Sequence, residues 1–397
     1  KRQGATHAWA QASVLDLYDP DRSWLVIHDD KPSTWDEFLV FLDRQIQELR
    51  TDGGKGLAIL SEEDASPATS MLRDRLDEAL PQATWHIDAL TAATRRQPQL
   101  RLERADVILS LDCDLLNTED AGVAYRKAFA KRRSVDRPGD PMNRLYAIEP
   151  CPTVTGMSAD HRLRLPLSQM YSYVLQLAQA LGVEGLPEPA APTWDQRWID
   201  TVADDLRSHS ERSIVAAGRR LPEHVHEVVR RINQQLGNIG NTVLPSQPLA
   251  EANSFRRLLQ RLQAGEVTML VLLGVNPMIS APSDIDFRSL MQKVQTRIHL
   301  GLYRDETAEL CQWHVPQAHY LESWGDAQMG DTLSPVQPVI EPLMGGKTAL
   351  ELLARLAGWS TTDPYALVRE SFATVTGDAD VDRRFRDYLH TGVAVVE

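Results

Sequence analysis

The chain has 397 residues, of which 43% are hydrophobic and 24% charged, so we expect a folded globular protein of two or three domains and exclude fibrous and wholly disordered classes. Its 55 acidic and 42 basic side chains give a formal net charge of −13, which offers no net attraction to nucleic-acid phosphates or anionic lipid heads. Because the first residue is Lys1 and no signal segment is present, we expect a piece of a longer precursor.

The cysteine content excludes a metal cluster held by this chain alone. The three cysteines, Cys113, Cys151 and Cys311, are far apart and never form C-x-x-C, so they cannot supply four thiolates to an iron–sulfur cluster or a structural zinc. The longest apolar run covers residues 269–275, whereas a membrane helix needs about 20 residues. We therefore expect no direct membrane span.

The first 80 residues follow a pattern of helix, strand, helix, strand and helix. We expect a short helix and a Tyr-Asp-Pro turn within residues 1–22, a short strand at 24–28, and a helix through residue 49 with a capped start within residues 33–37. A buried strand at 56–60 and a helix at 70–80 follow. This order is typical of an α/β unit.

The same alternation restarts at residue 105. Residues 105–111 and 144–148 predict strands that are apolar on both faces, with a helix near 121–132 between them and another at 167–181. Residues 185–192 (GLPEPAAP) are the best candidate for a linker, and we place a domain crossing near them.

A third α/β pass follows the linker. We expect helices around 194–209, 223–236 and 252–264, strands at 213–217 and 267–274, and a helix-then-strand pair around 294–301. An amphipathic helix at 348–357 and an acidic segment from Asp363 end the chain.

Two glycine-containing segments are candidate ligand sites, and a third is not. Gly345-Gly346-Lys347-Thr348 lacks the first glycine of a phosphate loop, since Glu341 stands there, so a simple turn is the better interpretation. Asn238 and Gly240 lie in LGNIGN, which would suit either an anion cradle or a helix C-cap. Gly274 and Asn276 follow the most apolar strand, where open α/β sheets bind ligands, although a tight turn also explains them.

The densest polar and aromatic cluster covers residues 313–326. His314, His319 and Glu322 would serve acid–base chemistry. The same composition suits an interface loop, in which Trp313, His319, Glu322 and Trp324 contact a partner.

Several motifs together resemble the dimethyl sulfoxide reductase family of molybdopterin oxidoreductases. They occur in the family's order: YDPDR (18–22), TWDEF (34–38), ADVIL (105–109), LGNIG (236–240), GVNP (274–277) and DET (305–307). QASVLDLY (11–18), AHYLESWGD (318–326) and VQP (336–338) are more narrowly similar to the molybdopterin-oxidoreductase-like portion of the large iron–sulfur subunit of alternative complex III. That bacterial respiratory assembly oxidises quinol and passes electrons to cytochromes.

The resemblance implies an α/β fold of two Rossmann-like three-layer domains with mostly parallel sheets, one inserted in the other, as in the formate dehydrogenase and dimethyl sulfoxide reductase type. Residues 1–103 and 205–360 would form the parent domain and residues 104–204 the insert. Residues 361–397 would extend toward an iron–sulfur domain outside this sequence.

The sequence departs from catalytic relatives at the positions that bind cofactors. His7 stands where relatives carry the last cluster cysteine, eleven residues before Tyr18. Residues 81–104, where relatives place the serine, cysteine or selenocysteine that binds molybdenum, contain neither serine nor cysteine, which leaves Asp88 as a weak candidate ligand. Residues 165–169 (LPLSQ) replace the Pro-Gly-Thr-Asp turn that reads the pterin nucleotide.

The leading hypothesis is therefore a scaffold without a cofactor in a periplasmic respiratory complex. It would position the iron–sulfur domain of the same polypeptide and the membrane and cytochrome subunits, with no catalytic residue of its own and no nucleic-acid partner. The alternative is an active molybdenum enzyme that binds molybdopterin guanine dinucleotide and uses an unusual ligand such as Asp88. A third possibility is that the strand ends near Asn276 and Asn238 still bind a small nucleotide.

Overall fold

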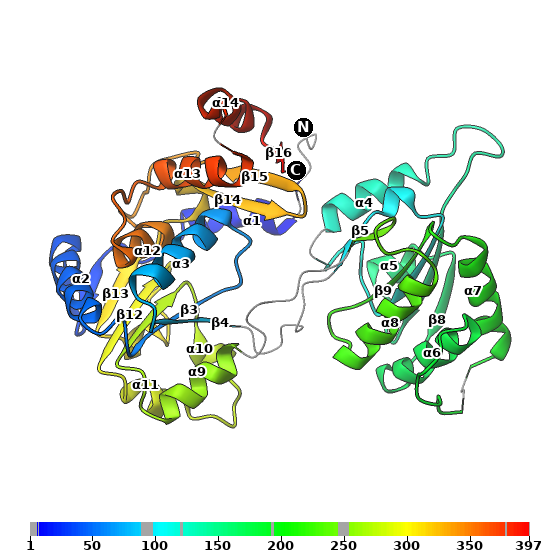
Figure 1. The fold of residues 1–397 in the computed structure, drawn as a ribbon, viewed down its shortest axis with the longest axis horizontal. Coiled ribbons are helices and arrows are strands. Elements are labelled where there is room, and N and C mark those ends of the chain that lie inside the picture. The colour runs from blue at the N-terminus through cyan, green and yellow to red at the C-terminus, as the bar shows by residue number, and fades with distance from the viewer. Residues whose placement is uncertain are drawn as a thin grey trace. The chain divides into compact units, whose positions relative to one another are not determined.

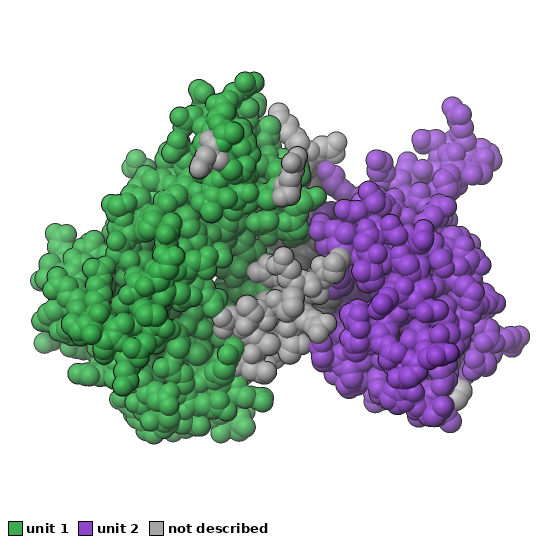
Figure 2. Space-filling model, in the orientation of Figure 1, with its two compact units in different colours: residues 1–91, 253–397 green, residues 92–252 purple. Residues whose placement is uncertain are grey.

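The computed structural model describes residues 6, 8–88, 98–119, 122–191, 194–244, 254–377 and 379–396. The chain divides into two compact units (Figures 1 and 2). Unit 1 comprises residues 1–91 and 253–397, and unit 2 comprises residues 92–252. One unit is therefore inserted into the sequence of the other.

A seven-stranded sheet forms the centre of unit 1. Its order is β2-β1-β13-β12-β11-β3-β4, and the five strands from β13 to β4 are parallel. These are β3 (Leu57–Ser61), β4 (Thr84–Ile87), β11 (Met269–Leu273), β12 (Thr296–Gly301) and β13 (Trp313–Pro316). The hairpin of β1 (Val26–His28) and β2 (Lys31–Ser33) adds an antiparallel edge.

Helices cover both faces of this sheet, because its central strands are apolar on both sides. Along β3, Leu57 and Ile59 face one core while Ala58 and Leu60 face the other. The first face packs against α2 (Trp35–Arg50), α3 (Pro67–Ala79) and α12 (Ala349–Ala357), and the second against α9 (Ser254–Gln263) and α11 (Phe287–Gln292). The result is a three-layer α/β arrangement.

The C-terminal residues are part of unit 1 rather than a separate extension from residue 361. They form α13 (Pro364–Thr376), α14 (Val381–Thr391) and β16 (Ala394–Val395), which pairs with the β14 (Gly325–Met329) and β15 (Thr332–Val336) hairpin. Phe372, Phe385 and Tyr388 are buried in the same core as α3 and α12. The segment stays on unit 1 because these aromatic side chains need its apolar surface.

Unit 2 contains a four-stranded parallel sheet of order β8-β7-β6-β9. The strands are β6 (Val107–Leu111), β7 (Arg144–Glu149), β8 (His161–Arg164) and β9 (Ser213–Ala217). One face packs against α6 (Leu167–Ala180), α7 (Gln196–Ser208) and α8 (Glu223–Gln235), and the other against α4 (Gly122–Lys131). A short antiparallel pair, β5 (Gln99–Leu100) with β10 (Val243–Leu244), completes the unit.

The predicted bounds of the insert, residues 104–204, are too narrow. β9 pairs with β6 along its whole length, from Val107 opposite Ser213 to Leu111 opposite Ala217. Val225, Val228 and Ile232 of α8 are buried in the same core as Leu109. Residues 185–191 consequently lie between two helices of unit 2 and do not mark the domain crossing, because the sheet needs β9 to cover the apolar edge of β6.

Candidate functional site

Each parallel sheet has a topological switch point, which is where open α/β sheets bind their ligands. In unit 1, β3 connects through α3 to β4, which pairs with one side of β3, while β11 pairs with the other side. In unit 2, β6 is flanked in the same way by β7 and β9. The residues that follow these strands are the candidate sites.

Gly274 and Asn276 lie at the carboxyl end of β11, as predicted. Gly274 has φ of +67°, and a Cβ atom there would lie 3.2 Å from the side-chain Oε1 of Gln317. Asn276 donates from Nδ2 to Glu306 at 2.8 Å and accepts from the Thr307 hydroxyl at 2.6 Å. Both ends of the Asn276 amide are thus engaged by the DET segment that the sequence motifs singled out.

Two carboxylates complete this edge of unit 1. Asp88 follows β4 and accepts from the Ser280 hydroxyl at 2.7 Å, and burial raises its pKa. Burial also raises the pKa of Glu62, which follows β3, with further contributions from Asp88 and Asp64. An added phosphate would meet negative charge here, which disfavours a nucleotide.

The corresponding edge of unit 2 also carries carboxylates, which are engaged by arginines or by hydrogen bonds of the chain itself. Asp112, directly after β6, accepts two bonds from Arg220, at 3.2 and 2.8 Å. Asp114 accepts from the amide and the hydroxyl of Thr155 at 2.9 and 2.8 Å. Gly218, after β9, lies so close that a Cβ atom would be 1.8 Å from the carbonyl oxygen of Asp112. The two strand ends therefore meet backbone to backbone at this switch point.

The side chain of Glu149, the last residue of β7, occupies the place after the strand where an external anion would bind. Glu149 is buried and accepts from the amide and hydroxyl of Thr153 at 3.2 and 2.7 Å and from Arg162 at 2.7 Å. A Cβ atom on Gly156, in the short helix α5 (Val154–Met157), would lie 1.7 Å from Glu149 Oε1. The donors and the space that an external anion would need are taken by the chain's own side chain.

Asn238 and Gly240 do not join Gly274 and Asn276 in one site. They belong to unit 2, and Asn238 is fully buried, with its Oδ1 accepting from Ser213 at 3.1 Å and its Nδ2 donating to Asn233 at 3.0 Å. Ser213 begins β9, so Asn238 lies at the amino end of the sheet, away from the edge where ligands bind. The prediction that Asn238 lines a site at the strand ends is wrong, because its amide is used to hold α8 onto β9.

The predicted interface tryptophans are not exposed anchors. Trp313 is 2% exposed, stacks on His28 with ring centroids 4.0 Å apart, and packs edge-on against Phe38. Trp324 is half-buried and packs edge-on against Tyr365. Both side chains contribute to the core of unit 1, since aromatic rings bury a large apolar area.

His319 and Glu322 form an internal network rather than an interface or an acid–base pair. The side chains of Arg22 and Glu322 have no exposed surface and meet at 2.7 Å. Glu322 also accepts from the amides of His319 and Leu343, both at 2.9 Å. Burial raises the pKa of Glu322, but Arg22 and these amides outweigh it and hold the pKa below its usual value. Glu322 is therefore a carboxylate that ties the N-terminal segment to the 313–326 cluster.

His314, a candidate for acid–base chemistry in the sequence, belongs to a second buried network that no motif indicates. His314 shares a hydrogen bond of 2.6 Å with the Ser23 hydroxyl through Nε2 and one of 3.0 Å with His299 through Nδ1. Burial, His299 and Arg304 lower the pKa of His314 to about 3, and burial lowers that of His299. The signal that would have found the pair is the register of β12 and β13, which places the two residues side by side.

His7, at the position of the family's cluster cysteine, lies outside the described residues. Within the described ranges, no three His, Cys, Asp or Glu side chains are grouped so as to hold a metal ion. None of the helices described is long and apolar enough to cross a bilayer.

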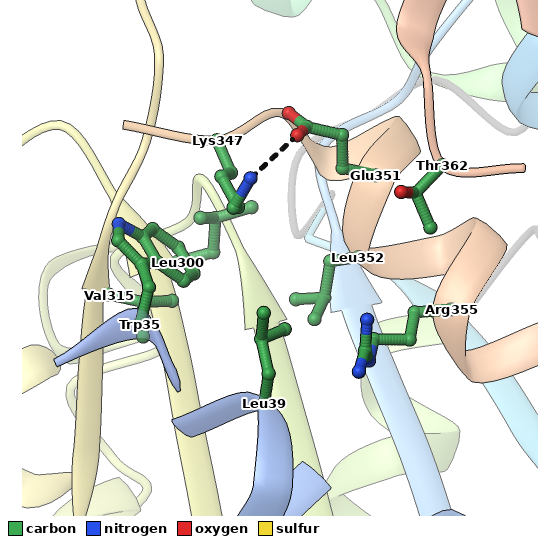
Figure 3. A pocket seen from close by; sticks show the side chains of 9 residues that line it. All are labelled: Trp35, Leu39, Leu300, Val315, Lys347, Glu351, Leu352, Arg355 and Thr362. Carbon is green, nitrogen blue, oxygen red and sulfur yellow. Dashed lines mark hydrogen bonds and ion pairs between the residues drawn. The ribbon is translucent and has the colours of Figure 1, made fainter. Parts of the chain in front are cut away.

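A small pocket of about 50 Å³ lies in unit 1, between α2, α12 and the ends of β12 and β13 (Figure 3). Its lining is apolar at the base and charged at the rim, where Lys347 and Glu351 form an ion pair of 3.0 Å. The sequence pattern predicts only a turn around Lys347 and gives no indication of this pocket.

The fold has a counterpart among solved structures. Acetylene hydratase from Pelobacter acetylenicus superposes with a TM-score of 0.71, and the match covers 97% of this chain and 68% of that one. The fold is similar to that of the dimethyl sulfoxide reductase family. This confirms the predicted fold class, a mixed α/β chain with mostly parallel sheets. At 12% sequence identity, the similarity concerns the fold alone.

Comparisons of the sequence itself found no relative. No protein-family model and no curated protein matches the chain.

The residues at both switch points do not suit the dinucleotide that the family resemblance implies. A pyrophosphate is normally held by convergent backbone amides at a glycine-rich turn. Here Glu62 and Asp88 lie at one edge, and Asp112, Asp114 and Glu149 at the other. The donors near Glu149 are already used by that side chain. Because these hydrogen-bond donors are already used within the chain, the arrangement does not require a bound dinucleotide.

Proposed function

We propose that this chain is a cofactor-free scaffold domain of a respiratory quinol-oxidising electron-transfer complex. It positions an iron–sulfur domain of the same polypeptide and membrane and cytochrome subunits on the periplasmic side of a bacterial inner membrane. The oxidoreductase-like fold supports this role, and so does the sequence resemblance to the large subunit of alternative complex III. In this role the fold supplies geometry while neighbouring segments carry the electrons.

The observation that carries the proposal is the occupation of the β7 turn by Glu149. This buried carboxylate satisfies the amide and hydroxyl of Thr153 and is neutralised by Arg162. A phosphate would have to displace an internal ion pair and bury a second negative charge, which is costly. Glu62 and Asp88, at the switch point of unit 1, also disfavour the binding of a phosphate, because they would place negative charge beside it.

The interface that a scaffold needs is better supplied by the N-terminal segment than by Trp313 and Trp324. Helix α1 (Ala8–Leu17) has an apolar composition, yet its large side chains Trp9 and Leu15 are 84% and 76% exposed. Tyr18 and Trp24, which follow it, are 67% and 64% exposed. Exposed aromatic side chains in one segment are typical of an interface core. We assign this segment to the contact with the iron–sulfur domain.

A double substitution tests this assignment in the intact complex. W9S/W24S should reduce recovery of the partner subunits with the affinity-tagged full-length protein by at least about fivefold, because aromatic anchors dominate interface energies. The melting temperature of the variant should stay near that of the wild type. I279S, which changes another exposed apolar residue of unit 1, is the matched control and should assemble normally. Normal assembly of the double variant would refute this interface.

One observation favours the alternative of an active molybdenum bis-pterin oxidoreductase. Asp88 Oδ1 is buried and has no hydrogen-bond partner among the described residues, so a ligand-accepting oxygen is available at that position. If the alternative held, D88N would lose the metal from protein purified with it. Under the scaffold proposal, D88N has the same metal content as the wild type, because neither binds molybdenum.

A further inference from the structure

The base of the pocket in unit 1 is made of aliphatic side chains from separate elements (Figure 3). Leu39 comes from α2, Leu300 and Val315 from the ends of β12 and β13, and Leu352 from α12. The Trp35 ring forms a wall and is fixed by its indole N–H, which donates to the carbonyl of Gly345 at 3.0 Å. This base suits the apolar body of a ligand.

The rim offers the Lys347 ammonium as a hydrogen-bond donor beside the Glu351 carboxylate. Lys347 Nζ lies 3.0 Å from Glu351 Oε1 and 5.5 Å from the centre of the Trp35 ring. An ammonium group has three N–H donors, so two remain after the bond to Glu351. The second oxygen of Glu351 already accepts from the amide and hydroxyl of Thr348 at the start of α12. A ligand head therefore meets the Lys347 ammonium as its best partner.

A second cation, Arg355, also lines the pocket. Arg355 lines the pocket and is oriented by two bonds to Asp43, at 2.8 and 2.6 Å, while Asp43 itself lies outside the lining. Lys347 and Arg355 thus face the pocket, each paired with one carboxylate, Glu351 or Asp43, so an anion would be recognised through the N–H groups that these pairs leave free.

We propose that this pocket binds a short aliphatic monocarboxylate, with the hydrocarbon tail on the leucine base and the carboxylate on Lys347. The volume of about 50 Å³ sets the size. It is roughly a third of a cavity that accommodates benzene, a molecule of six carbon atoms, so a tail of about two or three carbon atoms fills it. A ligand with so few atoms binds with a dissociation constant in the millimolar range.

The test is a titration of the full chain with butyrate, followed by NMR chemical shifts or calorimetry. We expect saturable binding with a dissociation constant of about 1–10 mM. Acetate should bind at least about fivefold more weakly because it lacks the tail, and 1-butanol at least about fivefold more weakly because it lacks the charge. Absence of saturable butyrate binding up to about 100 mM would overturn the proposal, since even fragment-sized ligands saturate a matched pocket below that concentration.

Variants assign the binding to the named residues. K347Q should weaken butyrate by at least about fivefold and leave 1-butanol unchanged, whereas K347R, which keeps the charge, should stay within about twofold of the wild type. K55Q removes an exposed lysine of the same unit outside the pocket and should change neither ligand. L39F, which fills the base, should abolish binding of both ligands in a protein that still unfolds cooperatively. Unchanged butyrate affinity in K347Q, or in folded L39F, would contradict the assignment.

Discussion

At the residue scale, the buried carboxylate of Glu322 links the 313–326 cluster to the N-terminal segment through Arg22. His319 and Glu322 were predicted within a dense polar cluster, and both are there, but as members of a buried network with Arg22. The reason is that Arg22 lies 300 positions earlier in the chain, so no local pattern links the two residues. Gly274 and Asn276, whose position depends only on the end of one apolar strand, were correctly placed.

The buried ion pair of Arg22 and Glu322 yields a stability prediction. E322A should lower the free energy of unfolding by about 3–5 kcal/mol, because it leaves the Arg22 guanidinium buried without a counter-charge. E78A, which breaks the exposed pair of Arg75 and Glu78, should cost less than about 1 kcal/mol. Urea unfolding of both variants measures the difference, and a cost below about 1 kcal/mol for E322A would contradict a stabilising role for this pair.

The histidine pair yields a pH prediction. The folded-state pKa values of His299 and His314 lie below that of an unfolded chain, which is about 6.5. Between these values the unfolded chain binds protons that the folded chain does not. The free energy of unfolding should therefore fall as the pH decreases from about 6.5 toward 4, by about 1.4 kcal/mol per pH unit for each histidine that stays neutral.

Urea titrations at several pH values check this slope. H314Q should be less stable at neutral pH but should show a shallower loss below pH 6, because one titrating group is gone. Identical slopes in the wild type and H314Q would show that other groups control the acid sensitivity.

At the element scale, long periodic elements could be predicted, whereas short ones and exact starts could not. The prediction of a capped helix start within residues 33–37 is confirmed, and the structure identifies Thr34 as the cap, since its hydroxyl accepts from the amide of Glu37. Helix α3 begins at Pro67 rather than residue 70, because Ser66 caps it and proline suits the first turn. The β14–β15 hairpin was not predicted, since its residues lack apolar alternation and it is stabilised by pairing with β16 and packing near α13.

The close approach of β6 and β9 makes Gly218 irreplaceable. G218A should lower the free energy of unfolding by about 2–3 kcal/mol, because its Cβ would meet the Asp112 carbonyl at 1.8 Å and the strand ends would have to separate. G325A is the matched control, since its Cβ would lie 3.5 Å from Val336, an ordinary contact, and it should cost less than about 1 kcal/mol. If G218A were as stable as G325A, the two strand ends would not be in contact.

At the scale of the whole molecule, the α/β class followed from alternating strands and helices, whereas the inserted arrangement was implied only by the family resemblance and its boundaries depend on non-local pairing. Residues 185–191 have a linker composition and yet connect α6 to α7 inside unit 2. The amino-acid composition of residues 185–191 indicates only a local preference for a loop. The boundary of unit 2 depends instead on which strand pairs with β6, and that pairing joins residues far apart in the sequence.

The boundaries can be tested with fragments. Residues 92–252 should fold alone and unfold cooperatively, because both cores that flank the β6 sheet lie within these residues. A fragment of residues 104–204 lacks β9 and α8, and should show neither near-ultraviolet circular dichroism nor a cooperative transition. Near-ultraviolet spectra and urea unfolding of the two fragments decide between the bounds. A cooperative transition in the shorter fragment would show that β9 and α8 are not needed to complete the inserted unit.

The central claim is that the fold supports electron transfer by position and binds no molybdopterin. The most direct measurement is the molybdenum and pterin content of the full-length protein, purified from its native membrane complex and normalised to its concentration. The scaffold proposal predicts far less than one molybdenum atom and one pterin per chain, in the wild type and in D88N alike. A stoichiometric amount of both in the wild type, with loss of the metal in D88N, would contradict it and establish the enzyme.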